Sequence, residues 1–491
     1  MIKTLSAKWD GWKNSVASLI NSPVVSVSVL FIIFFSAGTA LTYRSLSYPW
    51  HWDDLHLVRT FSTGELAGVF RGNWDVDDIE SRGYRPLTVV FNHLRSAAFG
   101  ECVVAHRLFD VALVAAYLAL LATLAMQLGL SYGGAVLGGI LAVSAKNNWW
   151  NLVWIVDGTH AFTELLVLLA AYLTVSAVRK FAIWKIVLAI LFAGLGLLTR
   201  EDAIAMFPVI PIFALVYAVE KKFAFFPNDR PAGVWRELRD LPWVLISSVS
   251  ALLVAMALLF FRVRSLLVPG IEMEVNLRKW SDHLAWALYP MGVPADGTTL
   301  YAVWVLWIAT LGLLACALAF PASGSSRLVI LLWLAAFFIT TTPIALAPGM
   351  VAPRPNLLLA PISFFSFGVA FLLSRLVAIS RRAMIPAACV MSVVLITSIA
   401  RNEIAQEAVH PKSLEYILNN SDFVWLDAAS ARIPEVRLIA AKQEFLELGI
   451  NSKAQFQQRF PELVQQAENL HLSRPNREGK PFMPRIEFLQ P

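Results

Sequence analysis

The chain carries little charge and few cysteines for its length. Only 15% of its 491 residues are charged, while 57% are hydrophobic; a soluble domain carries about 25% charged residues. Of its three cysteines, Cys316 and Cys389 fall inside apolar runs, so a disulfide framework is excluded. The chain also lacks a phosphate-binding glycine loop, a Cys-x-x-Cys pair and a dinucleotide-binding fingerprint. Nothing in the sequence therefore supports ATP-driven or redox chemistry.

Long apolar runs occupy most of the first 400 residues. A helix needs about 20 apolar residues to cross a hydrocarbon core about 30 Å thick, and lipid excludes irregular backbone. We therefore expect an all-α polytopic membrane protein. It should have about eleven transmembrane helices, at residues 23–42, 105–128, 132–147, 159–178, 182–199, 203–220, 242–262, 299–320, 328–347, 356–377 and 385–400.

The basic residues predict an orientation. The net charge of +6 would suit nucleic acid, but Lys and Arg lie mostly in short loops between the apolar runs, as at 179–185 and 381–382. This is the distribution of the positive-inside rule. It favours membrane lipid over nucleic acid as the partner. We expect a bacterial inner-membrane protein whose N-terminus is cytoplasmic and whose C-terminus is periplasmic.

This orientation divides the chain into two parts. Residues 1–400 form the expected transmembrane domain, with a large extracytoplasmic first loop at 43–104 and a second periplasmic loop at 265–298. Residues 401–491 form a periplasmic helical tail with amphipathic stretches and no 34-residue repeat. All three periplasmic segments are rich in polar groups.

The first loop contains two kinds of candidate residue. Asp53 and Asp54 follow the first apolar run, where a carboxylate beside a second one can act as a general base; acidic residues of an ordinary solvated loop are the alternative. Tyr84 and Arg85 precede Pro86, which can begin a helix because its missing N–H costs nothing at the first position. A guanidinium at the membrane surface can hold a phosphate or simply anchor the helix.

Further cations follow at the same face. Arg200 and Glu201 lie in a tight turn between two apolar runs, where ionisable residues are expensive and are functional candidates; a local ion pair is the alternative. Arg262 and Arg354 lie at the outer ends of two other runs. These positions run against the positive-inside preference and indicate an anionic neighbour.

A polar face is expected on the fourth helix. Asp157, His160 and Glu164 are spaced at i, i+3 and i+7, which places them on one side of a helix. The spacing allows a metal site or a proton relay, but ligands from a single helix are weak support for a metal. We favour a polar cavity wall and assign no metal ligand.

Read in order, these motifs resemble the GT-C glycosyltransferase superfamily. The resemblance covers residues 23–400 and rests on the acidic pair after the first helix, the Tyr84-Arg-Pro-Leu-Thr block, the Gly-Leu-Leu-Thr-Arg-Glu-Asp turn at 196–202, and Arg354. The chain is most similar to the membrane part of protein O-mannosyltransferases that carry tetratricopeptide repeats, and more loosely to lipid A aminoarabinose transferase. Those relatives' repeat domain and their His-Pro-x-His-x-Glu segment are missing.

The resemblance implies an inverting enzyme that takes its sugar from a polyprenyl-phosphate donor. In that scheme Asp53 or Asp54 is the general base, while Arg85, Arg200, Arg262 and Arg354 bind the donor phosphate. Tyr84, Glu201, Asp157 and His160 support the site or contact the sugar. The periplasmic acceptor is a glycan, a lipid or an exported protein. A divalent cation is left open as a cofactor.

Two other classes of protein remain. A flippase for a lipid-linked sugar or another anionic lipid would also need outward-facing arginines, but it predicts an inverted repeat and charges near the bilayer midplane. A scaffold that recruits a partner through its periplasmic tail would leave the clustered Arg and Asp residues without a purpose.

Overall fold

The computed structural model describes residues 23–46, 57–72, 74, 84–100, 102–145, 148–218, 324–345 and 355–379, with isolated positions between 249 and 257, between 388 and 400, and at 458. Over these residues the protein is helical, without a strand. The expected all-α class is therefore confirmed for the part of the chain that the structure describes.

Three described helices are long and apolar enough to cross a membrane: α2 (Pro23–Thr42), α6 (Val103–Gln127) and α9 (Gly158–Arg179). Shorter apolar segments accompany them: α7 (Tyr132–Ser144), α10 (Ile183–Thr199), Val329–Thr342 within α15 (Gly324–Ala345) and Leu359–Ser374 within α16 (Leu359–Ile379). A helical membrane protein is the class that these segments support. The expected helices at 242–262, 299–320 and 385–400 lie largely outside the described residues.

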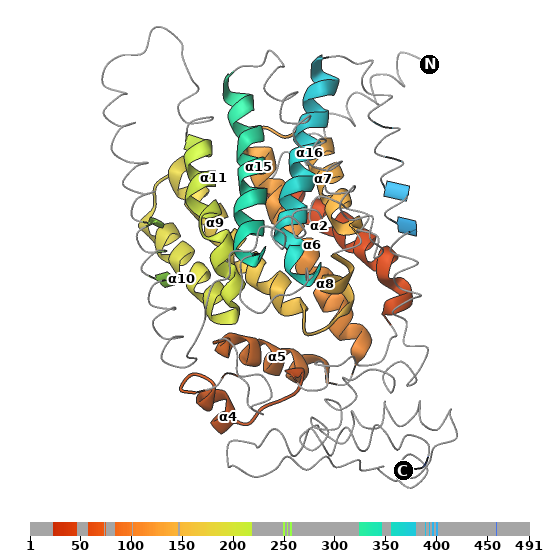
Figure 1. The fold of residues 1–491 in the computed structure, drawn as a ribbon, viewed down its shortest axis with the longest axis vertical. Coiled ribbons are helices and arrows are strands. Elements are labelled where there is room, and N and C mark those ends of the chain that lie inside the picture. The colour runs from red at the N-terminus through yellow and green to blue at the C-terminus, as the bar shows by residue number, and fades with distance from the viewer. Residues whose placement is uncertain are drawn as a thin grey trace, which may run out of the picture.

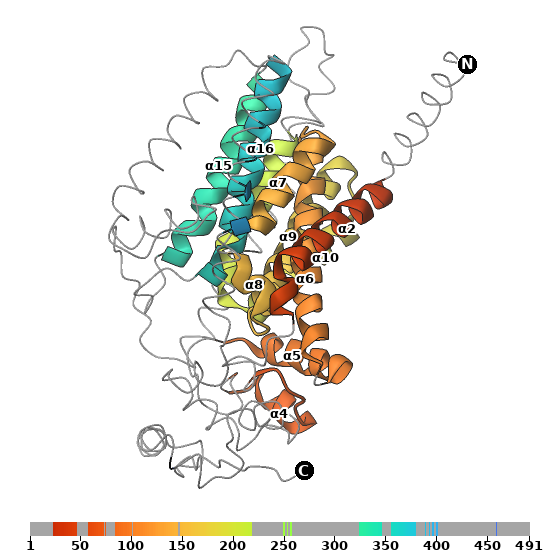
Figure 2. The same ribbon diagram turned by 90° about the vertical axis from the view of Figure 1, so that its right-hand side faces the viewer.

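The central helix of the bundle is α9. It packs along α6 and α10, and also along α11 (Val209–Tyr217), while α16 packs against α7 and α15. Figure 1 shows α15 and α16 following the long axis of the molecule, with α5 (Pro86–Phe99) and α4 (Thr63–Gly68) beyond the lower end of the bundle. The view at 90° places both helices at the same end (Figure 2). Residues of the first loop therefore cover one end of the bundle.

Apolar surface remains open on α10. Ile183, Trp184, Val187 and Leu191 follow the spacing of one helix face, and each is more than half exposed. Water would not favour such a continuous apolar stripe, whereas lipid would. At the start of α10 the Lys185 ammonium turns back and donates hydrogen bonds of 2.9 Å to the carbonyl and the hydroxyl of Ser176 on α9. This cation adds hydrogen bonds at the carbonyl end of α9, where the Ser176 carbonyl also accepts from the Lys180 amide.

A glycine allows α2 and α7 to approach closely. A Cβ placed on Gly139 would lie 2.1 Å from Cζ of Phe34, whose side chain is fully buried. Small residues at such crossings are the usual means by which membrane helices pack. Ser131 begins α7 by accepting a hydrogen bond from the Gly134 amide at 3.2 Å.

Two boundaries differ from the sequence prediction. The third apolar helix was expected to reach residue 147 but ends at Ser144, because Ala145 is extended (ψ 125°). The sixth was expected from residue 203; instead a 3-10 segment, η3 (Glu201–Met206), precedes α11, which starts after Pro208. Proline lacks the N–H needed inside a helix and is tolerated at its start.

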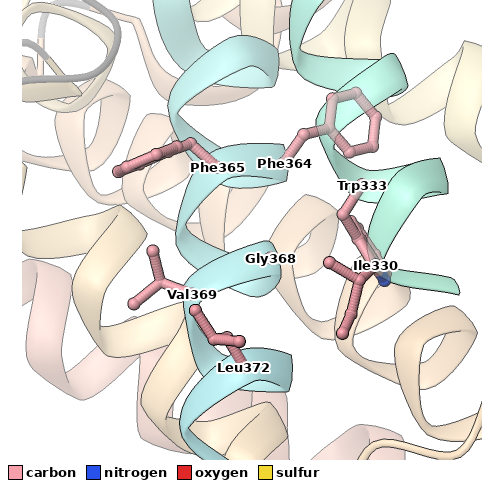
Figure 3. A pocket seen from close by; sticks show the side chains of 7 residues that line it. All are labelled: Ile330, Trp333, Phe364, Phe365, Gly368, Val369 and Leu372. Atoms are coloured by element: carbon pink, nitrogen blue, oxygen red, sulfur yellow. The ribbon is translucent and has the colours of Figure 1, made fainter. Parts of the chain in front are cut away.

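Helices α15 and α16 meet through aromatic rings. Trp333 is fully buried and stacks on Phe367 with ring centroids 5.7 Å apart. Figure 3 shows the small crevice beside this contact, lined by Ile330, Trp333, Phe364, Phe365, Gly368, Val369 and Leu372. Its lining is apolar, so it offers packing space and little polar chemistry.

Candidate functional site

The site is built where α10 ends and α5 begins. α10 ends at Thr199 and the chain turns through Arg200, Glu201 and Asp202; residues 199–202 are called the charged turn below. Pro86 occupies the first position of α5, as predicted. The buried hydroxyl of Thr88 then donates a 2.6 Å hydrogen bond to the Thr199 carbonyl. This bond fixes the start of α5 against the charged turn.

Arg85 and Glu201 form a bidentate ion pair across this junction. Nε and Nη2 of Arg85 donate to the two carboxylate oxygens of Glu201 at 2.7 and 2.6 Å. Their side chains are 15% and 20% exposed. The indole of Trp74, from the first loop, covers the guanidinium at 5.3 Å from its ring centroid and is itself 1% exposed. The Arg85 guanidinium was predicted to bind phosphate, and in the structure two of its N–H groups bind the Glu201 carboxylate instead.

The pKa of Glu201 reflects this pairing. Burial by itself raises that pKa, but the charge and hydrogen bonds of Arg85, together with the charge of Arg200, lower it from 4.5 to about 2. Glu201 is therefore ionised at neutral pH. Its described contacts join the charged turn to Arg85 at the start of α5.

Asp202, His160 and Asp157 form a second chain of polar contacts. The Nδ1 atom of His160 lies 2.7 Å from Oδ2 of Asp202, and Nε2 lies 3.6 Å from Oδ1 of Asp157. An ionised carboxylate only accepts hydrogen bonds, so Nδ1 carries the proton. Burial raises the pKa of Asp202, but His160 and Arg200 outweigh burial and hold it well below its usual range. A 1% exposed imidazole thus sits between two carboxylates.

Arg200 differs from the other charged residues of the cluster. Its side chain is 12% exposed, yet its contacts are long: 3.4 Å from Nη1 to the Thr159 hydroxyl and 3.5 Å from Nε to Oδ1 of Asp202. Burial and the neighbouring Arg85 charge lower the pKa of this guanidinium. Because arginine stays protonated in proteins, Arg200 is a buried cation that lacks short hydrogen bonds to described residues.

The polar face of α9 continues into the bundle. Glu164, 9% exposed, follows His160 by one turn and lies beside the backbone of Ala360 at the start of α16. Among described residues, no group of three His, Cys, Asp or Glu side chains is placed to hold a metal ion. Asp157, His160 and Glu164 therefore lie along one face at the start of α9, as their spacing predicted, and Asp157 and His160 are in polar contact with each other.

Tyr84 ties the first loop to the site. Its hydroxyl donates a 3.1 Å hydrogen bond to the Phe70 carbonyl, and burial raises its pKa. Of the predicted residues, the structure brings five together around the charged turn, with Tyr84 next to the first of them in sequence: Arg85, Asp157, His160, Arg200 and Glu201. Asp53, Asp54, Arg262 and Arg354 lie outside the described residues.

A buried ion pair that was not predicted from the sequence lies next to this site. Arg95 on α5 and Asp110 on α6 are 2.6 Å apart, with side chains 1% and 0% exposed. The signal was present, because His106, Arg107 and Asp110 lie in the first turns of an otherwise apolar helix. Ionisable residues there require partners.

The comparisons with known proteins give no family. No protein-family model matches the chain, and no curated protein is similar enough to count as a relative.

Proposed function

We propose that this chain is a membrane glycosyltransferase that transfers a sugar from a polyprenyl-phosphate donor to an acceptor outside the cytoplasm. The motifs of the GT-C superfamily motivate the class. One observation from the structure carries the proposal: Arg200 is a largely buried guanidinium with no described partner closer than 3.4 Å. A guanidinium fork can bind a phosphate in a bidentate way, as it binds a carboxylate.

The contacts of Arg85 and Arg200 suggest a different role for each arginine. Arg85 already makes a bidentate pair with Glu201, so its role in this proposal is to hold the charged turn against α5. The neighbouring Arg200 has an Nε atom without a hydrogen-bond partner among the described residues. In this proposal Arg200 binds the donor phosphate, assisted by Arg262 and Arg354. Asp157 and Asp202 accept hydrogen bonds from the sugar hydroxyls.

The reaction follows from these roles. Asp53 or Asp54 removes the proton of the acceptor hydroxyl, whose oxygen attacks the anomeric carbon. The bond from that carbon to the phosphate oxygen breaks, its electron pair stays on the lipid phosphate, and the anomeric configuration inverts. Arg200 stabilises the negative charge that builds on the phosphate. The donor's glycosyl phosphate bond is already activated, so no nucleotide takes part.

The same proposal includes the topology. About eleven helices cross the bacterial inner membrane, with a cytoplasmic N-terminus. The charged turn, α4 and α5 then lie at the periplasmic face, where the lipid-linked donor would present its sugar. A phosphatase fused at residue 230 should be inactive, since that loop is cytoplasmic; an active fusion would reverse the topology.

Sugar transfer is testable with purified protein. The protein is reconstituted with a radiolabelled polyprenyl-phosphate sugar and a periplasmic extract, and release of polyprenyl phosphate is measured. Arg200→Gln, Asp53→Asn and Asp54→Asn are compared with Arg179→Gln, which removes an exposed arginine at the opposite end of α9. We expect Arg200→Gln to abolish release, with at least one of the two Asp variants doing the same, while Arg179→Gln has no effect.

Two outcomes would contradict the proposal. Full release by Arg200→Gln would remove the phosphate role from this residue. Movement of the labelled lipid between leaflets, without its cleavage, would favour the flippase instead.

A further inference from the structure

Two buried arginines hold the chain segment that leads into α9. The α8–α9 connection consists of residues 154–157 and the two helix ends that flank them, Val153 of α8 (Trp149–Val153) and Gly158 of α9. Arg95 on α5 donates a 2.7 Å hydrogen bond to the Ile155 carbonyl, and Arg107 on α6 donates a 3.0 Å hydrogen bond to the Val153 carbonyl. Side chains from two different helices thus bind the carbonyls of Val153 and Ile155 in this connection.

Arg95 also joins α5 to α6. Its Nη2 atom donates to Oδ2 of Asp110 and to the His106 carbonyl, both at 2.6 Å. A buried ion pair is a weak source of stability, because the desolvation of both charges offsets their attraction. Such pairs can instead select a single arrangement of the elements that they join. Here the elements are α5, α6 and the α8–α9 connection.

Gly158 completes the arrangement. A Cβ on this residue would lie 1.8 Å from Oδ1 and 2.7 Å from Cγ of Asp110. The carboxylate cannot easily swing away, since Arg95 holds its other oxygen. Asp110 therefore lies directly against the first turn of α9, where negative charge is favoured by the helix dipole.

This first turn carries two residues of the candidate site. Asp157 is the N-cap of α9, and His160 lies in its first turn, 2.7 Å from Asp202. A displacement of the turn by the width of a methyl group would break that hydrogen bond. We propose that Arg95, Asp110 and Gly158 are positioning residues, which set the place of Asp157 and His160 against the charged turn. The consequence for catalysis, though not for geometry, rests on the proposed function.

The experiment reads the site geometry directly. The protein is labelled with ¹⁵N-histidine in lipid nanodiscs, and the Nδ1 resonance of His160 is assigned by its loss in His160→Gln. Asp202→Asn defines the resonance of the ring without its carboxylate partner. We expect Gly158→Ala and Arg95→Lys to move the resonance toward that of Asp202→Asn. Lysine keeps the charge of Arg95 but cannot reach three acceptors at once.

Gly133→Ala is the matched control. This glycine also lies in the first turn of a helix, α7, but a Cβ there meets nothing within 4 Å. Its His160 resonance should equal that of the wild type. An unmoved resonance in Arg95→Lys overturns the proposal, even if Gly158→Ala fails to fold. So does an equal movement in Gly133→Ala.

Kinetics separate this proposal from the function on which it rests. Where sugar transfer is detected, kcat of Arg95→Lys should fall on the order of 100-fold, the cost of a misplacement near 1 Å. The KM for the donor should change less than kcat, because Arg200, which binds the donor phosphate in the proposed function, does not lie on the displaced turn. A moved His160 resonance in a protein that transfers no sugar would leave the positioning role standing and defeat the proposed function. A moved resonance with unchanged kcat would overturn the catalytic consequence.

Discussion

The ion pair between Arg85 and Glu201 gives a prediction with a defined pH window. Glu201→Gln keeps the size of the side chain and removes its charge. The folded protein lowers the pKa of Glu201 from 4.5 to about 2. A shift of one unit corresponds to 1.36 kcal/mol, so ionised Glu201 contributes about 3 kcal/mol to the free energy of unfolding. Glu201→Gln should lose about this amount at pH 7.

The sign of the pH dependence follows from the lowered pKa. A carboxylate whose folded-state pKa lies below its unfolded value stabilises the protein above the unfolded pKa, and this contribution is lost as the pH falls through the folded pKa. The difference between wild type and Glu201→Gln should therefore be constant above about pH 5 and shrink between 4.5 and about 2. Comparing the two proteins at each pH cancels the titration of other carboxylates.

The assay is unfolding by added SDS in mixed micelles, followed by tryptophan fluorescence at a series of pH values. Glu65→Gln is the control. Glu65 accepts a 2.7 Å hydrogen bond from the Ser62 amide in the capping box of α4, and glutamine can make the same contact. The ion pair of Glu65 with Arg59 is long, at 3.8 Å, so its loss should cost little. The unfolding of this variant should change little at any pH. A Glu201→Gln difference that is independent of pH down to 2.5, or that equals the Glu65→Gln difference, would refute the assignment of this stability to the Arg85 pair.

Three other variants test neighbouring contacts by the same unfolding assay. Arg200→Gln should leave the free energy of unfolding unchanged or raise it, because it removes a buried cation with long contacts; a marked loss would contradict the assignment. Polyprenyl phosphate at 100 times its Kd should stabilise the wild type by about 2.7 kcal/mol and this variant not at all. Thr88→Val should cost about 1 kcal/mol by removing the hydrogen bond that anchors α5, and an unchanged midpoint would count against that anchor. Gly139→Ala should lower the free energy of unfolding by about 1–3 kcal/mol, because the added methyl group would overpack against Phe34. Gly133→Ala should leave it unchanged. Equal effects of the two substitutions would contradict the close approach of α2 and α7 at Gly139.

The apolar pattern located most of the helices. Residues 159–178 were expected for the fourth span and α9 occupies Gly158–Arg179, because a long apolar run bounded by polar residues has one stable state in lipid. The pattern failed where the boundary depends on local backbone chemistry. Pro208 delays α11, and the turn before it closes as a 3-10 segment that hydropathy alone does not reveal.

The candidate site could be predicted in its members but not in its pairings. Charged residues near apolar helix ends identified Arg85 and Glu201 separately. Their bidentate contact joins residues 116 positions apart and depends on how α5 crosses the end of α10. The ion pair between Arg95 and Asp110 could not be predicted for the same reason, because it depends on how α5 packs against α6. Local sequence identifies a residue that needs a partner, and tertiary packing decides which partner it has.

Satisfaction of hydrogen bonds separates structural arginines from the functional candidate. Arg95 has three acceptors within 2.7 Å, and Arg85 has two. Arg200, in the charged turn, has no acceptor closer than 3.4 Å among the described residues. A buried guanidinium without short contacts carries a desolvation cost that folding alone does not offset. Buried polar groups that lack short hydrogen bonds are expected at functional sites. A bound anion would supply the hydrogen bonds that Arg200 lacks among the described residues. The Arg85–Glu201 and Arg95–Asp110 pairs, whose shortest contacts are 2.6 Å, connect the elements around Arg200; in the proposed function they hold it in place for the donor phosphate.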